Sequence, residues 1–217
     1  MKVLTLVLAL LTPSLAAAQI AGVPVDALTP DGMHRVDVNL PFHAGVQLFY
    51  APEGQARATL RVDVEVGSDA ADAADAAAWF VRTSAGALPR LDGVGDHARG
   101  ASDLVAFVRD NVFVVVRPLT QGPDGVSIAH RLDDVIQRAP RGSTASAPVA
   151  LPALTTGSNA LQLPGWVLAS NVEARGAASA RRTRGGWVVS LGESAPYGLT
   201  VQTCDAMLRR RVTTLER

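Results

Sequence analysis

The sequence predicts an α+β protein, with a largely antiparallel sheet that carries helices on one face and is followed by a small β-sandwich-like domain. Strand-like alternation and helix-like spacing of apolar residues are interspersed through residues 19–138. Short apolar runs separated by Gly, Ser and Pro fill residues 159–217 instead. The charge also changes, because residues 19–140 hold 10 arginines and 16 acidic residues, whereas residues 157–217 hold eight arginines and four acidic residues.

The first residues have the three parts of a secretory leader. Lys2 supplies a positive charge, an apolar run follows, and Ala16–Ala18 are the small residues that a signal peptidase requires. The apolar run is about half of the roughly 20 residues that a membrane-spanning helix needs. The sequence therefore predicts a signal peptide over residues 1–18, cleaved near Ala18, and a secreted or periplasmic protein without a transmembrane segment.

Three strands and a helix are expected first. Residues 34–41 and 45–50 have strand-like patterns, and residues 59–66 alternate apolar and charged side chains as a half-buried strand does. Ser68 is expected to cap an alanine-rich helix, since alanine is the best helix former. The apolar group Trp79–Val81 near the end of this helix is expected to dock on the sheet.

A hairpin with two apolar faces is expected next. Residues 104–109 and 112–117 are strands joined by Asp110-Asn111, two residue types that tolerate the positive φ of a tight turn. The register predicts that Phe107 faces Val114 and that Val108 faces Phe113. A sheet with helices on one side should alternate apolar and polar residues. We therefore expect the second domain, another copy, a partner or an apolar ligand to cover the other face.

An amphipathic helix and a linker complete the first part. The apolar residues Ile128, Leu132, Val135 and Ile136 recur with helical spacing. The stretch that follows is rich in Pro, Ser, Thr and Ala, which is typical of linkers. The predicted organisation is a signal peptide, an α+β domain over 19–138, a linker over 139–158 and a small all-β domain over 159–217.

The sequence contains no recognisable catalytic constellation. Asp96 and His97 are adjacent in a glycine-rich loop, which leaves a hydrolase-type site open, but neighbours in sequence rarely point at each other and no partner serine has a recognisable setting. The four histidines are scattered and Cys204 is the only cysteine, so neither a metal site nor a cofactor is predicted. Cys204 is expected to be buried and inert, or else to pair with a cysteine of another chain.

A longer pattern carries a resemblance. It comprises G-D-x-A at Gly95–Ala98, an apolar strand, Arg109-x-Asn111 with a valine-rich strand, and A-x-x-L-D-x-x-I at Ala129–Ile136. This order resembles extracytoplasmic sensor or binding-type domains of bacterial envelope proteins. The resemblance assigns no catalytic residue, and it implies a binding module rather than an enzyme.

The C-terminal part is expected to be all-β. Residues 187–189 and 198–201 have strand-like patterns, and the rhythm of GWVVSLGESAPYGLTVQTCDA is similar to immunoglobulin-like modules of bacterial surface proteins. Its arginines offer either a solvated surface, a contact with the acidic first domain or a site for an anionic ligand. The arginines that we single out are Arg181, Arg182, Arg184, Arg209 and Arg211.

The function predicted from sequence is an exported, non-enzymatic binding or protein-interaction module of the bacterial envelope. Its partner is an envelope protein or an apolar or anionic ligand, and not a nucleic acid, because the exported chain is nearly neutral. The alternatives are a hydrolase using Asp96 and His97 and a structural accessory subunit of an envelope complex. In the first domain, Phe107, Phe113 and Val115 of the apolar hairpin are the candidate binding residues.

Overall fold

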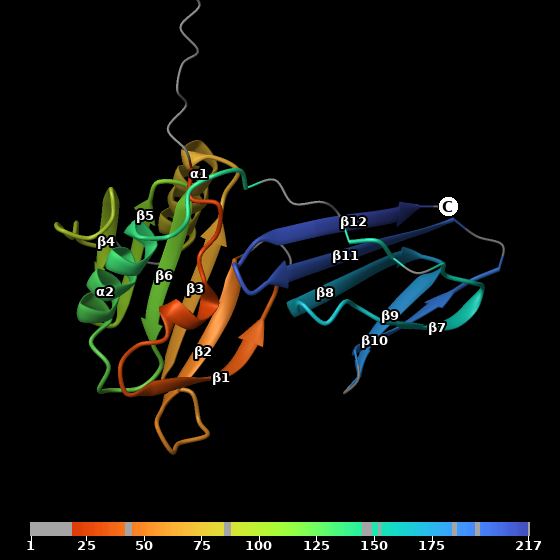
Figure 1. Cartoon of the computed structure of the whole chain (residues 1–217), viewed down its shortest axis with the longest axis horizontal. Helices are drawn as coiled ribbons and strands as arrows, with labels where there is room; N and C mark the ends of the chain where they lie inside the picture. Colours follow the sequence, from red (N-terminus) through yellow and green to blue (C-terminus); the bar gives the residue numbers. More distant parts are fainter. Residues whose placement is uncertain are drawn as a thin grey trace, which may run out of the picture.

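The computed structural model describes residues 19–41, 45–84, 88–144, 149–151, 153–183, 186–193 and 196–216. The predicted signal peptide lies outside these residues. The architecture is mostly antiparallel sheet with two helices, arranged as an N-terminal unit and a C-terminal unit (Figure 1).

The N-terminal unit is a six-stranded antiparallel sheet with the strand order β1-β2-β3-β6-β5-β4, and both helices belong to it. Its elements are the 3₁₀ helix η1 (Val25–Leu28), β1 (Met33–Asn39), β2 (Val46–Pro52), β3 (Leu60–Val66), α1 (Ala70–Thr83), β4 (His97–Ala101), β5 (Leu104–Arg109), β6 (Val112–Pro118) and α2 (Gly125–Gln137). The expected strands and helices are all present, and β4 is an additional edge strand where the sequence predicted a loop.

The hairpin β5–β6 has the predicted register. Phe107 lies opposite Val114 and Val108 lies opposite Phe113. Asp110 has a φ of 55°, the positive value that the sequence predicted for the turn.

The expectation that helices cover one face of the sheet is wrong. The side chains of Val105 and Phe107 pack in the core with α2, whereas those of Ala106 and Val115, on the opposite face, pack with α1. A hairpin that is apolar on both faces needs cover on both, and the chain provides it with its own two helices. The second face is therefore covered by α1, and not by the second domain, another copy, a partner or a ligand, as the sequence analysis expected.

The start and the docking of α1 also differ from expectation. Asp69, not Ser68, is the N-cap, and its side chain accepts a 2.9 Å hydrogen bond from the backbone N–H of Asp72. Phe80 packs on the sheet with its ring centroid 5.8 Å from that of Phe113. Trp79 is 58% exposed, because it lies one residue off the inward stripe that includes Ala73, Ala76 and Phe80.

The C-terminal unit consists of two three-stranded antiparallel sheets, ordered β7-β10-β9 and β12-β11-β8. Buried residues of both sheets, including Leu161, Val189 and Leu199, form one apolar cluster. Leu151 and Leu154, from the segment predicted as linker, pack against this cluster. The strands are β7 (Gly157–Leu161), β8 (Val167–Gly176), β9 (Ala178–Thr183), β10 (Gly186–Leu191), β11 (Tyr197–Asp205) and β12 (Arg210–Glu216).

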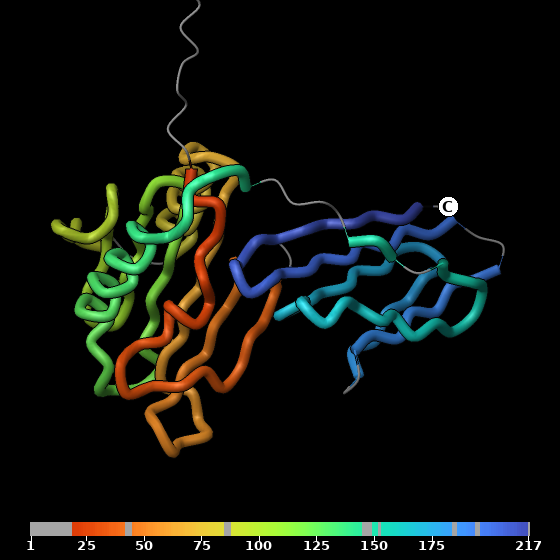
Figure 2. The backbone as a smooth tube through the Cα atoms, in the orientation of Figure 1, coloured from red at the N-terminus to blue at the C-terminus, as the bar shows by residue number. Residues whose placement is uncertain are grey.

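The segment that precedes β1 connects the two units. The backbone N–H groups of Val23 and Val25 donate 2.9 Å hydrogen bonds to the carbonyl oxygens of Met207 and Ala206. Figure 2 shows this segment, in red, running beside the chain that follows α2. Ala169, Cys204 and Leu208 of the C-terminal unit join the buried core of the N-terminal sheet, so the two units share apolar core.

Asn111 holds the start of the segment that precedes β1, at Ile20. The fully buried side chain accepts a 2.9 Å hydrogen bond from the N–H of Ile20, and its amide donates to the carbonyl oxygens of Ile20 (3.1 Å) and Gly67 (2.9 Å). One amide side chain thus pairs with two buried backbone groups of Ile20 and the part-buried carbonyl of Gly67, and such groups are costly to leave unpaired.

We expect Asn111→Ala to lower the free energy of unfolding by about 3 kcal/mol, because it leaves the buried N–H and carbonyl of Ile20 and the part-buried carbonyl of Gly67 without partners. Urea unfolding measures this loss. The control is Asn39→Ala, which removes a hydrogen bond to the partly buried side chain of Gln47 and should cost about 1 kcal/mol or less. Equal losses in the two variants would contradict the role of Asn111.

Candidate functional site

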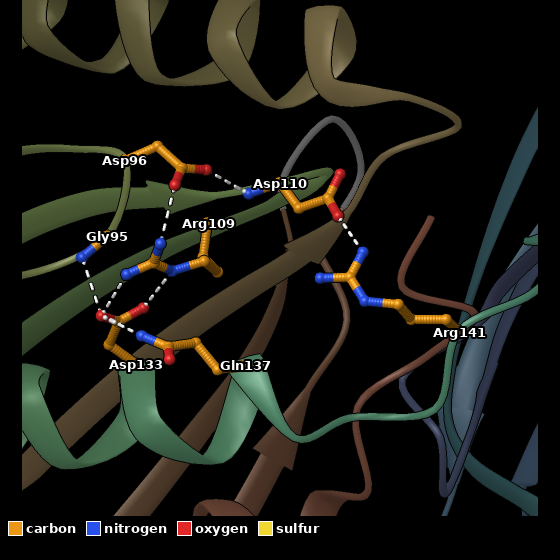
Figure 3. Close-up of polar contacts among 7 residues, drawn as sticks. All are labelled: Gly95, Asp96, Arg109, Asp110, Asp133, Gln137 and Arg141. Atoms are coloured by element: carbon orange, nitrogen blue, oxygen red, sulfur yellow. Dashed lines mark hydrogen bonds and ion pairs between the residues drawn. The ribbon is translucent and has the colours of Figure 1, made fainter. Parts of the chain in front are cut away.

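Asp96, the acid of the candidate acid–histidine pair, is used in the hairpin turn. Its carboxylate accepts a 2.7 Å hydrogen bond from Nη1 of Arg109 and a 2.6 Å hydrogen bond from the backbone N–H of Asp110 (Figure 3). His97 is exposed at the beginning of β4. Both oxygens of Asp96 therefore hold the turn, which disfavours Asp96 as the partner of a catalytic histidine.

Arg109 connects this turn to α2. Its Nε and Nη2 atoms each donate a 2.7 Å hydrogen bond to Asp133, whose side chain is almost fully buried. Oδ2 of Asp133 also accepts from the backbone N–H of Gly95 at 2.9 Å and from Gln137 at 3.2 Å (Figure 3). Burial alone would raise the pKa of the Asp133 carboxyl, but these hydrogen bonds and the charge of Arg109 hold that pKa below its usual value.

The polar residues of the sequence pattern over Gly95–Ala98, Arg109–Asn111 and Ala129–Ile136 therefore lie together. Gly95, Asp96, Arg109 and Asp133 form one hydrogen-bonded network, and Asn111 holds the adjacent segment. Arg141 extends the network by pairing with Asp110 at 2.5 Å. Each contact orients a loop, a turn or a helix, so the arrangement is structural and supplies no free nucleophile or base.

The remaining catalytic and metal candidates are not brought together. His34 lies 3.9 Å from Glu53 and His130 is exposed, while His43 lies outside the described residues. Within the described ranges, His, Cys, Asp and Glu side chains form no group of three that could hold a metal ion. Cys204 is buried as predicted, and burial raises the pKa of its thiol to about 12.

The candidate apolar residues are core residues of the N-terminal unit. Phe107 is buried on the α2 face of the sheet, whereas Phe113 and Val115 are buried on the α1 face. The structure therefore separates Phe107 from the other two residues. Phe113 and Val115 also border a groove beside α1.

The candidate arginines divide between two sheets. Arg181 and Arg182 are exposed on β9, whereas Arg209 and Arg211 both pair with Asp205, at 2.8 Å and 3.3 Å. Arg211 also lies over the ring of Trp166, 4.2 Å from its centroid. The ion pairs hold Arg209 and Arg211 at the turn between β11 and β12. Arg184 lies outside the described residues.

A groove beside α1 is the candidate ligand site in the part of the chain that the structure describes. It has a volume of roughly 1000 Å³, at the upper end of the range for small-molecule sites. One side of the groove is α1, and the other is the sheet surface formed by the neighbouring strands β6 and β3, so the groove lies where the cover of the sheet by α1 ends. The aromatic and charged residues that line the groove include Arg61, Asp63, Glu65, Trp79, Phe80 and Arg117.

The two walls of the groove differ in chemistry. Trp79 and Phe80 make the α1 wall aromatic. The β3 wall is charged, with Arg61 bonded to Asp63 through Nε–Oδ1 at 2.7 Å and Nη2–Oδ2 at 2.6 Å. Burial raises the pKa of Glu65, farther along the same strand. An apolar wall facing a polar wall suits an amphiphilic ligand.

Sequence reasoning missed the groove because its residues come from three separate elements. Arg61 and Asp63 read as the solvent face of a strand, and Trp79 read as part of the docking end of a helix. One signal was available, since a tryptophan off the inward stripe of a helix has to be exposed. The inward stripe could not be identified from the sequence, because alanines occupy every face of this helix.

Comparison of the chain with protein-family models, curated proteins and solved structures found no match. In the part of the chain that the structure describes, no helix is long and apolar enough to cross a membrane. The candidate site therefore depends on geometry and chemistry alone.

We expect Asp133→Asn to lower the free energy of unfolding by about 3 kcal/mol at neutral pH, because it removes the charge that Arg109 pairs with in a buried position. The folded-state pKa of Asp133 lies below the unfolded value of 3.8, so this stabilisation is complete above pH 3.8 and is lost as the pH falls through the folded-state pKa. The difference from wild type should shrink in that acid range.

Urea unfolding at a series of pH values measures both effects. Asp92→Asn is the matched control, because Asp92 pairs with Arg90 on the surface and should contribute no measurable stability. A constant difference between wild type and Asp133→Asn across the acid range would contradict the assignment.

Proposed function

We propose that the protein is an exported, non-enzymatic binding module of the bacterial envelope, and that a small amphiphilic ligand lies in the groove beside α1. The observation that carries the proposal is the exposed Trp79 on the rim of a groove with one apolar and one charged wall. Large exposed aromatic side chains are unusual on a solvated surface and frequent in binding sites. The hydrolase alternative loses support, because Asp96 is engaged by Arg109 and the turn.

The C-terminal unit supports the same proposal as a spacer or attachment module. Its two sheets share one apolar cluster, an arrangement compatible with the small immunoglobulin-like sandwich that the sequence predicts. We propose that this unit presents the groove-bearing N-terminal unit at a fixed orientation, since the two units share core residues.

Export is tested by expressing the full chain in a bacterial host and sequencing the N-terminus of the periplasmic product. We expect cleavage after Ala18, so that the mature chain begins at Gln19, directly before the buried Ile20. Recovery of the chain in the cytoplasm with Met1 intact would contradict the proposed location.

Ligand binding is tested with Nile red, an uncharged apolar dye, on the mature chain. We expect its fluorescence to rise on binding, and Trp79→Ala to weaken binding by about tenfold, because the aromatic wall is lost. Trp166→Ala is the control, since Trp166 is also exposed but lies outside this groove. Unchanged binding by Trp79→Ala would place the dye elsewhere and contradict the proposal.

A further inference from the structure

A second groove lies on the other side of α1, between the last turns of this helix and the edge strand β4. Its volume is roughly 570 Å³, and we call it the β4 groove. Ala78, Val81 and Arg82 form its α1 wall, whereas Trp79 and Phe80 line the first groove. The two grooves therefore have different sides of the same helix as walls.

Two arginines are held side by side in the β4 groove. Arg90 and Arg99 lie opposite each other in an isolated antiparallel bridge. Backbone hydrogen bonds of 3.1 Å and 2.9 Å between their chain neighbours lie on either side of this bridge. The two arginines are thus a non-hydrogen-bonded pair, the type in which the Cα atoms are about 4.5 Å apart and the side chains are closest.

Both arginines point to the α1 face of the sheet. Ala98 packs in the core on the α2 face and Leu91 packs against this core. Successive residues of a strand point to opposite faces, so Arg90 and Arg99 point the other way, and both line the groove with Arg82. Like charges directly opposite each other destabilise a sheet. An anion beside this pair would relieve the repulsion.

The carboxylates of the β4 groove already have partners. Asp92 pairs with Arg90 at 3.2 Å, and Asp96 accepts hydrogen bonds from Arg109 and from the backbone N–H of Asp110. Among the described residues that line the groove, Asp92 and Asp96 are the only acidic ones. The groove therefore has no further carboxylate that could neutralise another cation.

Two arginines of the β4 groove remain without an anionic partner in the part of the chain that the structure describes. Arg82 makes no hydrogen bond or ion pair there, and Arg99 donates a 3.2 Å hydrogen bond to the carbonyl oxygen of Leu88. The exposed His97 lies on the same face of β4 as Arg99. The groove thus carries an excess of positive charge.

We propose that the β4 groove binds phosphate or the phosphate group of a larger ligand, held by Arg90 and Arg99 on one wall and Arg82 on the other. Guanidinium groups bind phosphate oxygens through parallel, charge-assisted hydrogen bonds, which are stronger than neutral ones. A phosphate group carries nearly two negative charges at neutral pH, and so matches two uncompensated arginines better than a carboxylate does. The inference does not depend on the ligand proposed for the first groove.

The test is an NMR titration of the ¹⁵N-labelled mature chain with sodium phosphate at constant ionic strength and neutral pH. We expect saturable shifts of the backbone amide signals of Arg82 and Arg99. Arg82→Gln and Arg99→Gln should each weaken binding by about tenfold or more, because each removes charge-assisted hydrogen bonds. Arg181→Gln, which changes an exposed arginine on β9, is the matched control and should bind phosphate as wild type does.

Thermal unfolding of the same samples checks folding and separates binding from a general salt effect. Arg99→Gln removes a charge opposite Arg90, so in sodium chloride it should unfold at or above the wild-type temperature. Phosphate also stabilises proteins by exclusion from their surface. We expect phosphate, compared with chloride of equal ionic strength, to raise the unfolding temperature of wild type more than that of Arg99→Gln. Equal rises would show exclusion alone and overturn the inference.

Phenyl phosphate, as a second probe, distinguishes the two sources of the phosphate group. Tighter binding of phenyl phosphate than of inorganic phosphate would show that the group belongs to a larger ligand with an apolar part beside Ala78 and Val81, and equal binding would show that inorganic phosphate is sufficient. Both results support the site. Shifts that do not saturate, or binding that Arg82→Gln or Arg99→Gln leaves unchanged, would overturn it. Nile red binding should be the same in wild type and Arg99→Gln, so a failure of either groove is detected separately.

Discussion

The bidentate contact of Arg109 with Asp133 is the interaction on which the N-terminal unit depends. It joins the hairpin turn to α2, and Asp133 also receives the N–H of Gly95, so one buried carboxylate positions three segments far apart in sequence. Breaking a buried ion pair leaves an uncompensated charge, which costs more than the pair contributes. The two next residues of the turn continue the connection, Asp110 to Arg141 and Asn111 to Ile20.

This network also explains a sequence pattern that resembles a binding or sensor domain. Glycine, aspartate, arginine and asparagine are residue types common in active sites, and the chain uses them here to close a hairpin against a helix. Both oxygens of Asp96 and both oxygens of Asp133 are occupied by donors. The hydrogen bonds and the charge of Arg109 hold the pKa of Asp133 below its usual value, and the donors on both carboxylates hold a turn, a loop and a helix in place.

The sequence predicted elements well and their arrangement less well. Alternation in 59–66 and the apolar stripe of 125–137 depend on local periodicity, which the chain displays directly. The hairpin was read correctly as apolar on both faces, but the side on which α1 packs depends on long-range geometry. The signal was present in the alternation of Ala106 and Val108 with Val105 and Phe107, since both sets need cover. The groove could not be predicted, because it appears only when α1, β3 and β6 are placed together.

The groove follows from a difference in width between helix and sheet. An α-helix is about 10 Å across and strands lie about 4.8 Å apart, so one helix covers about two strands. On one face, α2, the N-terminal segment and core residues of the C-terminal unit cover the sheet. On the other, α1 covers β5 and β6, and β3 presents Arg61 and Asp63 to solvent. The edge of the cover by α1 runs between β6 and β3, where the buried Phe113 and Val115 lie opposite Glu65 and Asp63. A ligand that matches both sides of this edge has to be apolar along one part and charged at the other.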